Sequence, residues 1–379
     1  MKKLLSMLLC LILACGMLVS CDEEREFGSY LPNYGDYQPE VDEKLTLNLY
    51  IITDDETADN AKDTVALNIS LYTTREYNTE LKVHYVTASK YRSQVTAAAN
   101  SSEEDGAHIV LINSLDMMRE FAVGKAAGGT VDLVERSPYL QDKAIGQLNV
   151  KIANALLESA KDFGKGELYA IPNNRIVGEY EYVLIDKWAN DEYSVIPPSM
   201  FENELGPDDL VGFEDLVDEL SEKLVENGKN PADYIKAQKG PYELQAALEA
   251  DGKYECIVVK NPTVDAELAF ASAFAIVDRG EKYNDRAMEM IYRINTDQKL
   301  RDLLQYGVVD INYRVVDGDI VRIEGDTTSY VMNLIYTGDI FTASYSSEIG
   351  WTADVAENGK NQNAEAVAEL IILPEEDAE

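Results

Sequence analysis

The chain has 379 residues, of which 46% are hydrophobic and 27% are charged, a composition typical of globular proteins long enough for two domains. Its 33 basic and 69 acidic residues give a formal net charge of −36, which argues against nucleic-acid binding because that requires clustered positive charge. The sequence has two histidines, His84 and His108, which disfavours a multi-histidine metal site. We therefore expect neither a metal nor a cofactor.

The first 20 residues have the pattern of a secretory signal. Lys2 and Lys3 precede an apolar run over residues 4–19, which is too short to span a bilayer comfortably. The run ends in LVSC at residues 18–21, which resembles the lipobox of bacterial lipoproteins. That resemblance implies cleavage before Cys21 and lipidation of its thiol, which would hold the protein on the extracytoplasmic side of the cell membrane by this anchor alone. The alternative is an unmodified signal peptide with an accidental cysteine.

Residues 21–43 are rich in Glu, Asp, Gly, Pro and Tyr without periodicity, which predicts a flexible acidic tether. After loss of the signal and lipidation of Cys21, only Cys256 remains, so no intrachain disulfide can form. Cys256 lies in an apolar run, which favours a buried small side chain over a nucleophile.

The folded part begins with a β-α-β-α-β pattern. Hydrophobic residues with a period of two predict strands, and residues at spacings of three and four predict helices. We expect Ser89 to cap the second helix, and Asn113 or Ser114 to cap the helix after the third strand. Such units build a parallel sheet with helices on both faces. The strands are expected over residues 45–51, 81–86 and 107–112, and the helices over residues 59–77 and 89–100.

The rest of the chain mixes strands and helices. Asp297 or Thr296 is expected to cap a helix that ends at Gly307, and Asp317-Gly318 to form the turn of a hairpin. The remaining strands are expected over residues 167–171, 180–185, 254–259 and 269–277. The helices are expected at 213–224, around 290–294, at 300–304 and at 364–370, and the hairpin over 313–323.

Several segments, in this order, resemble the extracellular solute-binding proteins of ABC transporters, the two-lobed maltose-binding type. ELYAIPNN at residues 167–174 looks like the first crossing between lobes, and FASAFAIV at 270–277 looks like the return crossing. The resemblance extends from about residue 45 to residue 366. It is also carried by DGAHIVLINS at 105–114, KGPYELQAAL at 239–248, NDRAMEMIYRINTDQKLRDLLQYG at 284–307, YGVVDINYRV at 306–315, YTGDIF at 336–341 and IGW at 349–351.

This resemblance implies an α/β protein with the two-lobed fold of type II periplasmic binding proteins. Each lobe is expected to be a mainly parallel sheet flanked by helices, with a hinge and an interlobe cleft. Lobe 1 is expected to comprise residues 44–173 and 275–313, and lobe 2 residues 174–274 and 314–379. The implied function is that of a lipid-anchored monomer that captures a small solute, most often a carbohydrate, and delivers it to the permease subunits of an ABC importer.

Two other function classes stay open from the residues alone. One is a surface enzyme acting on glycans, and the other is a lipoprotein that senses or scaffolds without transport. The sequence contains neither a G-x-S-x-G nor a G-x-x-x-x-G-K motif, and we expect no catalysis.

In an open parallel sheet, ligands bind outside the carboxyl ends of the strands. Amides and carboxylates there suit sugar hydroxyls, and an aromatic face suits the C–H face of a sugar ring. Because the negative net charge disfavours polyanions at long range, we expect a neutral solute, above all a carbohydrate. The structural alternatives are a helix-dipole role for Asp116, a solvent-exposed turn at Asn174 and Arg175, and core packing for the aromatic residues. Arg175 could also meet a ligand carboxylate. The predicted ligand-binding residues are Asn113, Asp116, Asn174, Arg175, Tyr242 and Trp351.

Overall fold

The computed structural model describes residues 43–122, 169–201 and 210–368. The predicted signal, Cys21 and nearly all of the predicted tether lie outside the described residues. Among the described helices, none is both long enough and apolar enough to cross a membrane.

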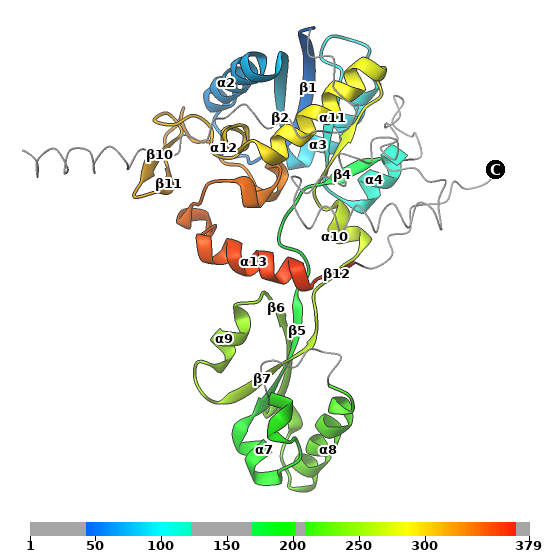
Figure 1. Ribbon diagram of the computed structural model, residues 1–379, viewed down its shortest axis with the longest axis vertical. Helices are drawn as coiled ribbons and strands as arrows, with labels where there is room; N and C mark the ends of the chain where they lie inside the picture. The colour runs from blue at the N-terminus through cyan, green and yellow to red at the C-terminus, as the bar shows by residue number, and fades with distance from the viewer. Residues whose placement is uncertain (1–42, 123–168, 202–209, 369–379) are drawn as a thin grey trace, which may run out of the picture. The chain divides into compact units, whose positions relative to one another are not determined.

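The first sheet has five strands in the order β2-β1-β3-β9-β4. Figure 1 labels β1, β2 and β4 of this sheet. The first three run parallel, and β9 runs antiparallel to both β3 and β4. Their bounds are Leu45–Thr53 for β1, Thr79–Thr87 for β2, Ile109–Ile112 for β3, Ala170–Pro172 for β4 and Ala273–Ile276 for β9.

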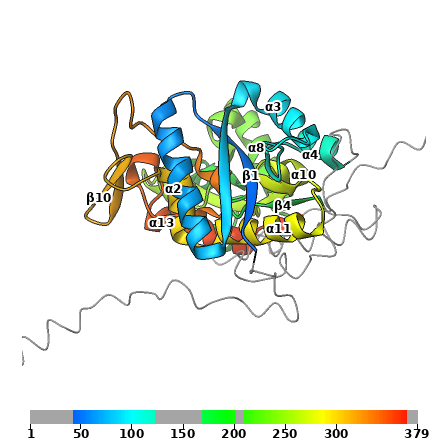
Figure 2. The ribbon, with the colours of Figure 1, turned by 90° about the horizontal axis from the view of Figure 1, so that it is seen from above.

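Two helices connect the parallel strands, α2 (Asp59–Tyr77) and α3 (Ala88–Asn100). Because β2 and β3 lie on opposite sides of β1, right-handed crossovers place these helices on opposite faces of the sheet (Figure 2). The bounds of α2 agree with the prediction. Ser89, however, lies inside α3, whose N-cap is Thr87, so its predicted capping role is wrong.

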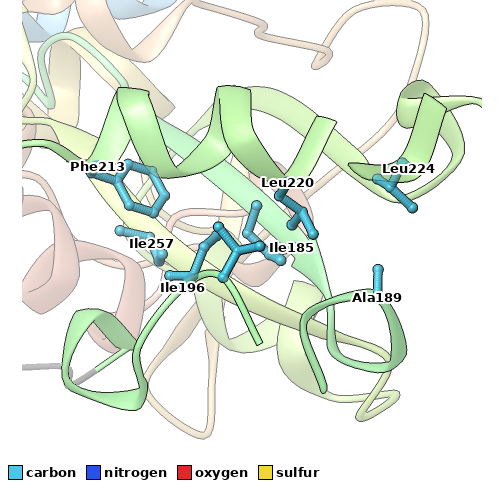
Figure 3. Close-up of a cluster of buried hydrophobic side chains, with 8 residues drawn as sticks. Ile185, Ala189, Ile196, Phe213, Leu220, Leu224 and Ile257 are labelled. Atoms are coloured by element: carbon cyan, nitrogen blue, oxygen red, sulfur yellow. The ribbon is translucent and has the colours of Figure 1, made fainter. Parts of the chain in front are cut away.

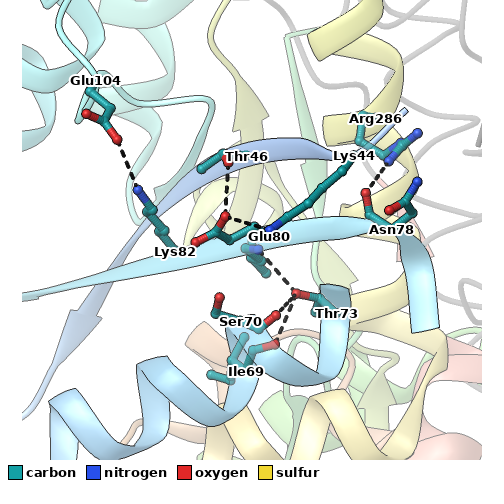
Figure 4. Close-up of polar contacts among 11 residues, drawn as sticks. Lys44, Thr46, Ile69, Ser70, Thr73, Asn78, Glu80, Lys82, Glu104 and Arg286 are labelled. Atoms are coloured by element: carbon teal, nitrogen blue, oxygen red, sulfur yellow. Dashed lines mark hydrogen bonds and ion pairs between the residues drawn. The ribbon is translucent and has the colours of Figure 1, made fainter. Parts of the chain in front are cut away.

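Polar contacts fix the register between α2 and the first two strands (Figure 4). The Thr73 hydroxyl is fully buried, donates to the Ile69 carbonyl at 3.0 Å and accepts from the Leu81 N–H at 3.2 Å. Glu80 on β2 accepts from the Thr46 hydroxyl at 3.3 Å and pairs with Lys44 at 3.1 Å. The side chain that anchors α2 thus also satisfies a strand N–H, which leaves little freedom for the helix to slide.

The second sheet has three strands in the order β6-β5-β7, with bounds Ile235–Gly240, Tyr180–Asp186 and Tyr254–Lys260. We expected mainly parallel sheets in both lobes, but β6 and β7 both run antiparallel to β5. The reason is that the helices α7 (Lys187–Tyr193) and α8 (Phe213–Glu226) return the chain to the end of the sheet where β5 finishes, so that Ile235 pairs with Ile185.

A cluster of apolar side chains packs α7 and α8 against this second sheet (Figure 3). Phe213, Leu220 and Leu224 project from one stripe of α8 and are buried, as their spacing predicts. They meet Ile185 of β5 and Ile257 of β7. This stripe is therefore what holds α8 on the sheet.

The remaining elements lie outside the two sheets already described or join them. α11 (Glu281–Thr296) ends just before Asp297, and α12 (Gln298–Tyr306) begins just after it. The side chain of Asp297 accepts from the Lys299 and Leu300 N–H groups and so caps α12, as predicted. The hairpin turns at Asp317 and Gly318, which have φ of 52° and 85°. The bounds are Leu115–Ala122 for α4, Leu244–Glu249 for α9, Thr263–Val264 for β8, Ala266–Phe270 for α10, Glu281–Thr296 for α11, Gln298–Tyr306 for α12, Tyr313–Val316 for β10, Asp319–Arg322 for β11, Ala353–Glu365 for α13 and Val367–Ala368 for β12.

Two predicted elements are wrong. The apolar run at residues 269–277 is divided between α10 and β9, because Asp265 accepts from the Leu268 N–H and so starts a helix that the hydrophobic pattern does not reveal. The helix predicted at residues 364–370 ends at Glu365, and β12 follows by pairing with β8.

We predict that Leu220→Ala lowers the free energy of unfolding by about 2–5 kcal/mol, because it removes a fully buried side chain from the centre of the α8 cluster. Val225→Ala on the same helix is the matched control, since Val225 is 61% exposed and its loss costs at most about 0.5 kcal/mol. Denaturant unfolding of both variants measures the difference. Equal stabilities for the two variants contradict the assigned packing.

Candidate functional site

The carboxyl ends of β1, β2 and β3 share one edge of the first sheet. Because β9 runs antiparallel to its neighbours, its first residue, Ala273, pairs with both Ile112 and Pro172. The end of β4 and the start of β9 therefore reach the same edge, which we name the strand-end edge. Ligands of open α/β sheets bind at such an edge.

Asn173 joins the two crossing segments at the strand-end edge. Its N–H donates to the Ser272 carbonyl at 2.9 Å, and its side-chain amide donates to the Ser272 hydroxyl at 2.9 Å and to the Ile335 carbonyl at 3.3 Å. Asn173 is 1% exposed. The first crossing, the return crossing and the chain near residue 335 thus meet at one side chain.

Asn174 is buried beside a carboxyl group. Its Nδ2 donates to Asp339 Oδ2 at 3.1 Å, and its carbonyl accepts from the Ile340 N–H at 3.0 Å. Asp339 Oδ1 accepts from the Phe341 N–H at 2.8 Å. Burial raises the pKa of Asp339 to about 7, although these hydrogen bonds and the charges of Arg301 and Lys360 oppose that rise.

The Oδ1 atoms of Asn173 and Asn174 have no hydrogen-bond partner among the residues that the structure describes. A buried amide oxygen without a partner loses hydration and gains nothing in return. Two such buried acceptors on consecutive residues therefore lie at the strand-end edge.

A buried arginine holds the chain that runs along this edge. Arg301 is 0% exposed, and its Nε donates to the Asp339 carbonyl at 3.0 Å while one Nη donates to the Leu334 carbonyl at 2.6 Å. The other Nη donates to the Thr337 hydroxyl. Gly338 has φ of 111°, and a Cβ there would lie 2.8 Å from Ile294. The segment over residues 334–339 is therefore fixed by both hydrogen bonding and space.

The chain just before this segment is tied to the residues that follow β1. The Thr57 hydroxyl donates to the Val331 carbonyl at 2.8 Å and accepts from the Val331 N–H at 3.0 Å. The Asp54 N–H also donates to the Val331 carbonyl, at 3.4 Å. Residues 330–340, which are predicted to belong to lobe 2, thus hydrogen-bond to residues that directly follow strands of the first sheet, such as Thr57 after β1 and Asn173 after β4. The lobe boundaries stay a prediction.

Tyr336 is a candidate ligand residue that the sequence analysis missed. It lies half-buried on a short 3-10 helix, η6 (Leu334–Thr337). The carbonyl of its neighbour Ile335 accepts from the Asn173 side-chain amide at 3.3 Å and from the Ser272 hydroxyl, which places the backbone of this turn at the strand-end edge. The signal that could have indicated this residue is the segment YTGDIF, in which Tyr336 lies two positions before Gly338, a glycine that the backbone conformation requires.

Three of the predicted ligand residues lie at or beside the strand-end edge. Asn113 is half-buried directly after β3, and Asn174 is buried at the first crossing. Arg175 is half-buried, and its guanidinium donates to the Leu268 carbonyl. Ser114 accepts from the Met117 N–H at 3.2 Å, which confirms it as the cap of α4.

Asp116 is 73% exposed in the first turn of α4 and lies 3.6 Å from Arg119. This local ion pair and the favourable position in the helix dipole account for the residue without a ligand. Its ligand role stays a prediction.

The two predicted aromatic platforms have different surroundings. Tyr242 is 44% exposed, its ring lies 6.0 Å from Tyr180 in an edge-to-face arrangement, and its N–H donates to Gln362 of α13. Trp351 is 3% exposed and packs 5.6 Å from Phe341, in agreement with the core-packing alternative. Neither ligand role is tested by these contacts, and both stay predictions.

The histidines have structural partners. His84 Nε2 lies 3.0 Å from Asn48 Oδ1, and its ring stacks on Tyr50 at 4.4 Å. His108 Nδ1 accepts from the Asn48 N–H at 3.2 Å, and burial lowers the pKa of His108 to about 4. Across residues 43–122, 169–201 and 210–368, no group of three or more His, Cys, Asp or Glu side chains is placed to hold a metal ion.

The fold is similar to that of solved solute-binding proteins. A structure of the N-glycan transport solute-binding protein NgtS from Streptococcus pneumoniae has a TM-score of 0.51 and 16% identity, covering 86% of this chain and 84% of that chain. The structure of its complex with Man5GlcNAc has a TM-score of 0.50 and 17% identity, with the same coverage of both chains. Protein-family models and curated proteins give no match to the sequence. The structural likeness confirms the predicted resemblance to solute-binding proteins at the level of the mixed α/β fold.

We predict that stability depends on pH through Asp339. Its folded-state pKa of about 7 lies above the ordinary value of 3.8, so the folded protein retains a proton that the unfolded chain releases between these values. The resulting stabilisation is present at acidic pH and is lost as the pH rises through 7. Asp339→Asn removes this ionisation, and an amide flip of Asn174 offers its unpartnered Oδ1 to the new NH₂ group.

Thermal unfolding from pH 4 to pH 8 checks this prediction. The difference in Tm between Asp339→Asn and the wild type should be smallest near pH 4 and should increasingly favour the variant up to pH 8. Asp326→Asn, at an exposed position, is the control and should follow the wild type throughout. A constant difference between Asp339→Asn and the wild type would contradict the raised pKa.

Proposed function

We propose that the protein is a lipid-anchored, monomeric solute-binding protein that captures a saccharide at the strand-end edge and delivers it to the permease subunits of an ABC importer. The observation that carries this proposal is that Asn173 and Asn174 bond to Ser272, Ile335 and Asp339 at the strand-end edge of a fold similar to that of solute-binding proteins, with Arg175 and Tyr336 directly beside these residues in the chain. Asn113, directly after β3, belongs to the same proposed site.

This combination suits a sugar ring. An aromatic ring covers the C–H face of a sugar and buries apolar surface, while amide oxygens and N–H groups hydrogen-bond the hydroxyls around the ring.

Tyr336→Ala should weaken saccharide binding by about 1–3 kcal/mol, by analogy with aromatic hot spots in desolvated sites. A thermal-shift screen over neutral and acidic oligosaccharides first identifies a ligand, and titration calorimetry then measures its Kd. Tyr193→Ala is the matched control, because Tyr193 is equally half-buried but lies on α7 beside the second sheet. Equal affinities of the two variants would remove Tyr336 from the site.

The absence of catalysis is part of this proposal. The saccharide recovered after prolonged incubation with the protein should be chemically intact by mass spectrometry. Shortened saccharides would instead favour the alternative of a glycan-active surface enzyme.

Cys21→Ala should release the protein from the membrane or leave it unprocessed, because the proposed anchor requires the thiol of Cys21. Membrane fractionation and the intact mass of the wild type and the variant measure this effect. Ser20→Ala, which keeps a small residue before the cysteine, is the control and should remain membrane-bound. If Cys21→Ala fractionates and migrates like the wild type, the proposed lipid anchor is wrong.

A further inference from the structure

Arg175 is a half-buried cation directly after the first crossing. Its carbonyl accepts from Asn363 of α13 at 2.8 Å, which fixes the backbone from which the side chain extends. The guanidinium donates to the Leu268 carbonyl of α10. A guanidinium carries five N–H donors, so one carbonyl leaves most of its hydrogen-bonding capacity unused.

Other arginines removed from solvent have more partners. Arg286 and Arg293 lie 3.5 and 3.7 Å from carboxylate oxygens of Glu289. Arg279 donates to three backbone carbonyls, at 2.9 to 3.1 Å. Within the described ranges, Arg175 has no carboxylate at ion-pair distance, although the chain has 69 acidic residues against 33 basic ones.

This lack of a counter-ion is costly to the protein alone. Burial lowers the pKa of the Arg175 guanidinium, and the Tyr336 hydroxyl is the group that opposes this effect. A cation taken partly out of water needs a compensating anion or a full set of hydrogen bonds. The acidic residues of the described ranges do not supply this anion, and the carboxylate of a ligand can.

We propose that Arg175 binds a carboxylate of the solute, so that the ligand is an acidic saccharide, such as one built from uronic acids, rather than a neutral one. This inference rests on the proposed function and specifies its substrate class. Arg175 binds the carboxylate with its fork of N–H groups, while Tyr336 covers the sugar ring and the amides of Asn173 and Asn174 bind its hydroxyls.

The negative net charge does not prevent this selectivity. Repulsion between the protein and an anionic sugar is screened beyond about 8 Å at physiological ionic strength. Inside the site, a guanidinium and a carboxylate interact at contact distance in a partly dry environment, where their attraction is stronger than in water. The local cation therefore outweighs the distant carboxylates once the ligand is bound.

The test compares each acidic saccharide with its own neutral form. The probes are oligosaccharides of galacturonate, glucuronate and mannuronate, their methyl esters, and the corresponding galactose, glucose and mannose oligosaccharides. The wild type should bind at least one acid about tenfold or more tighter than its methyl ester, as expected for a hydrogen bond to a charged group. Arg175→Gln should lose that preference while retaining its affinity for the ester. The acid-to-ester preference of Arg175→Lys should lie between those of the wild type and Arg175→Gln.

The variant comparison distinguishes recognition of the carboxylate from support of the fold. If Arg175 only supported the fold, Arg175→Gln would weaken the binding of acid and ester equally. If Arg175→Gln does not fold, the acid-to-ester ratio of the wild type decides alone. Equal binding of acid and ester by the wild type, or a preference that survives in Arg175→Gln, overturns the inference. Binding of neutral saccharides alone overturns it but leaves the proposed function standing, whereas binding of no saccharide overturns both.

Discussion

The strand order of the first sheet is the constraint on which the site depends. β1, β2 and β3 are parallel, so their carboxyl ends share an edge. Because β9 runs antiparallel to both β3 and β4, the start of β9 and the end of β4 bring both crossing segments to that same edge. Residues separated by about a hundred positions, such as Asn173 and Ser272, therefore bond directly. If β9 ran parallel to β3, the return crossing would reach the opposite edge of the sheet, and Asn173 would have no hydrogen bond to Ser272.

A second constraint is the fully buried Arg301, which organises the chain that completes the edge. Its guanidinium satisfies carbonyls and a hydroxyl of residues 334–339, and so fixes the position of Asp339 and of the helical turn that carries Tyr336. Asp339 then holds Asn174. The polar core of this region is thus one connected network, in which Asn174, the carboxyl group of Asp339 and the guanidinium of Arg301 depend on each other.

The sequence predicts the elements that short-range patterns control. The bounds of α2 follow from its apolar spacing, and the hairpin turn follows from Asp317-Gly318, whose residues adopt left-handed conformations. The run at 269–277 is misassigned because a continuous apolar segment fits a helix or a strand, and a single capping bond of Asp265 decides between them. The antiparallel second sheet was missed because periodicity reports no strand direction.

For the site, the sequence indicates Asn113, Asn174 and Arg175 from their positions at strand ends and crossings. It does not indicate the segment that carries Tyr336, because hydrogen bonds of Arg301 to positions more than thirty residues away bring that segment to the edge. Trp351 illustrates the opposite limit. Its polar sequence neighbours suggest exposure, whereas the packing of Phe341 and Ile340 buries it. Local composition does not reveal such long-range burial.

The central claim, that the strand-end edge binds a saccharide, is tested most directly by a crystal structure of the protein with the saccharide found by screening. The account predicts a sugar ring against the face of Tyr336, with ligand oxygens at hydrogen-bonding distance from Arg175 and the amides of Asn173 or Asn174. A saccharide bound elsewhere, for example against the exposed Trp188 that follows β5, with the strand-end edge unoccupied in the same crystal, would contradict it.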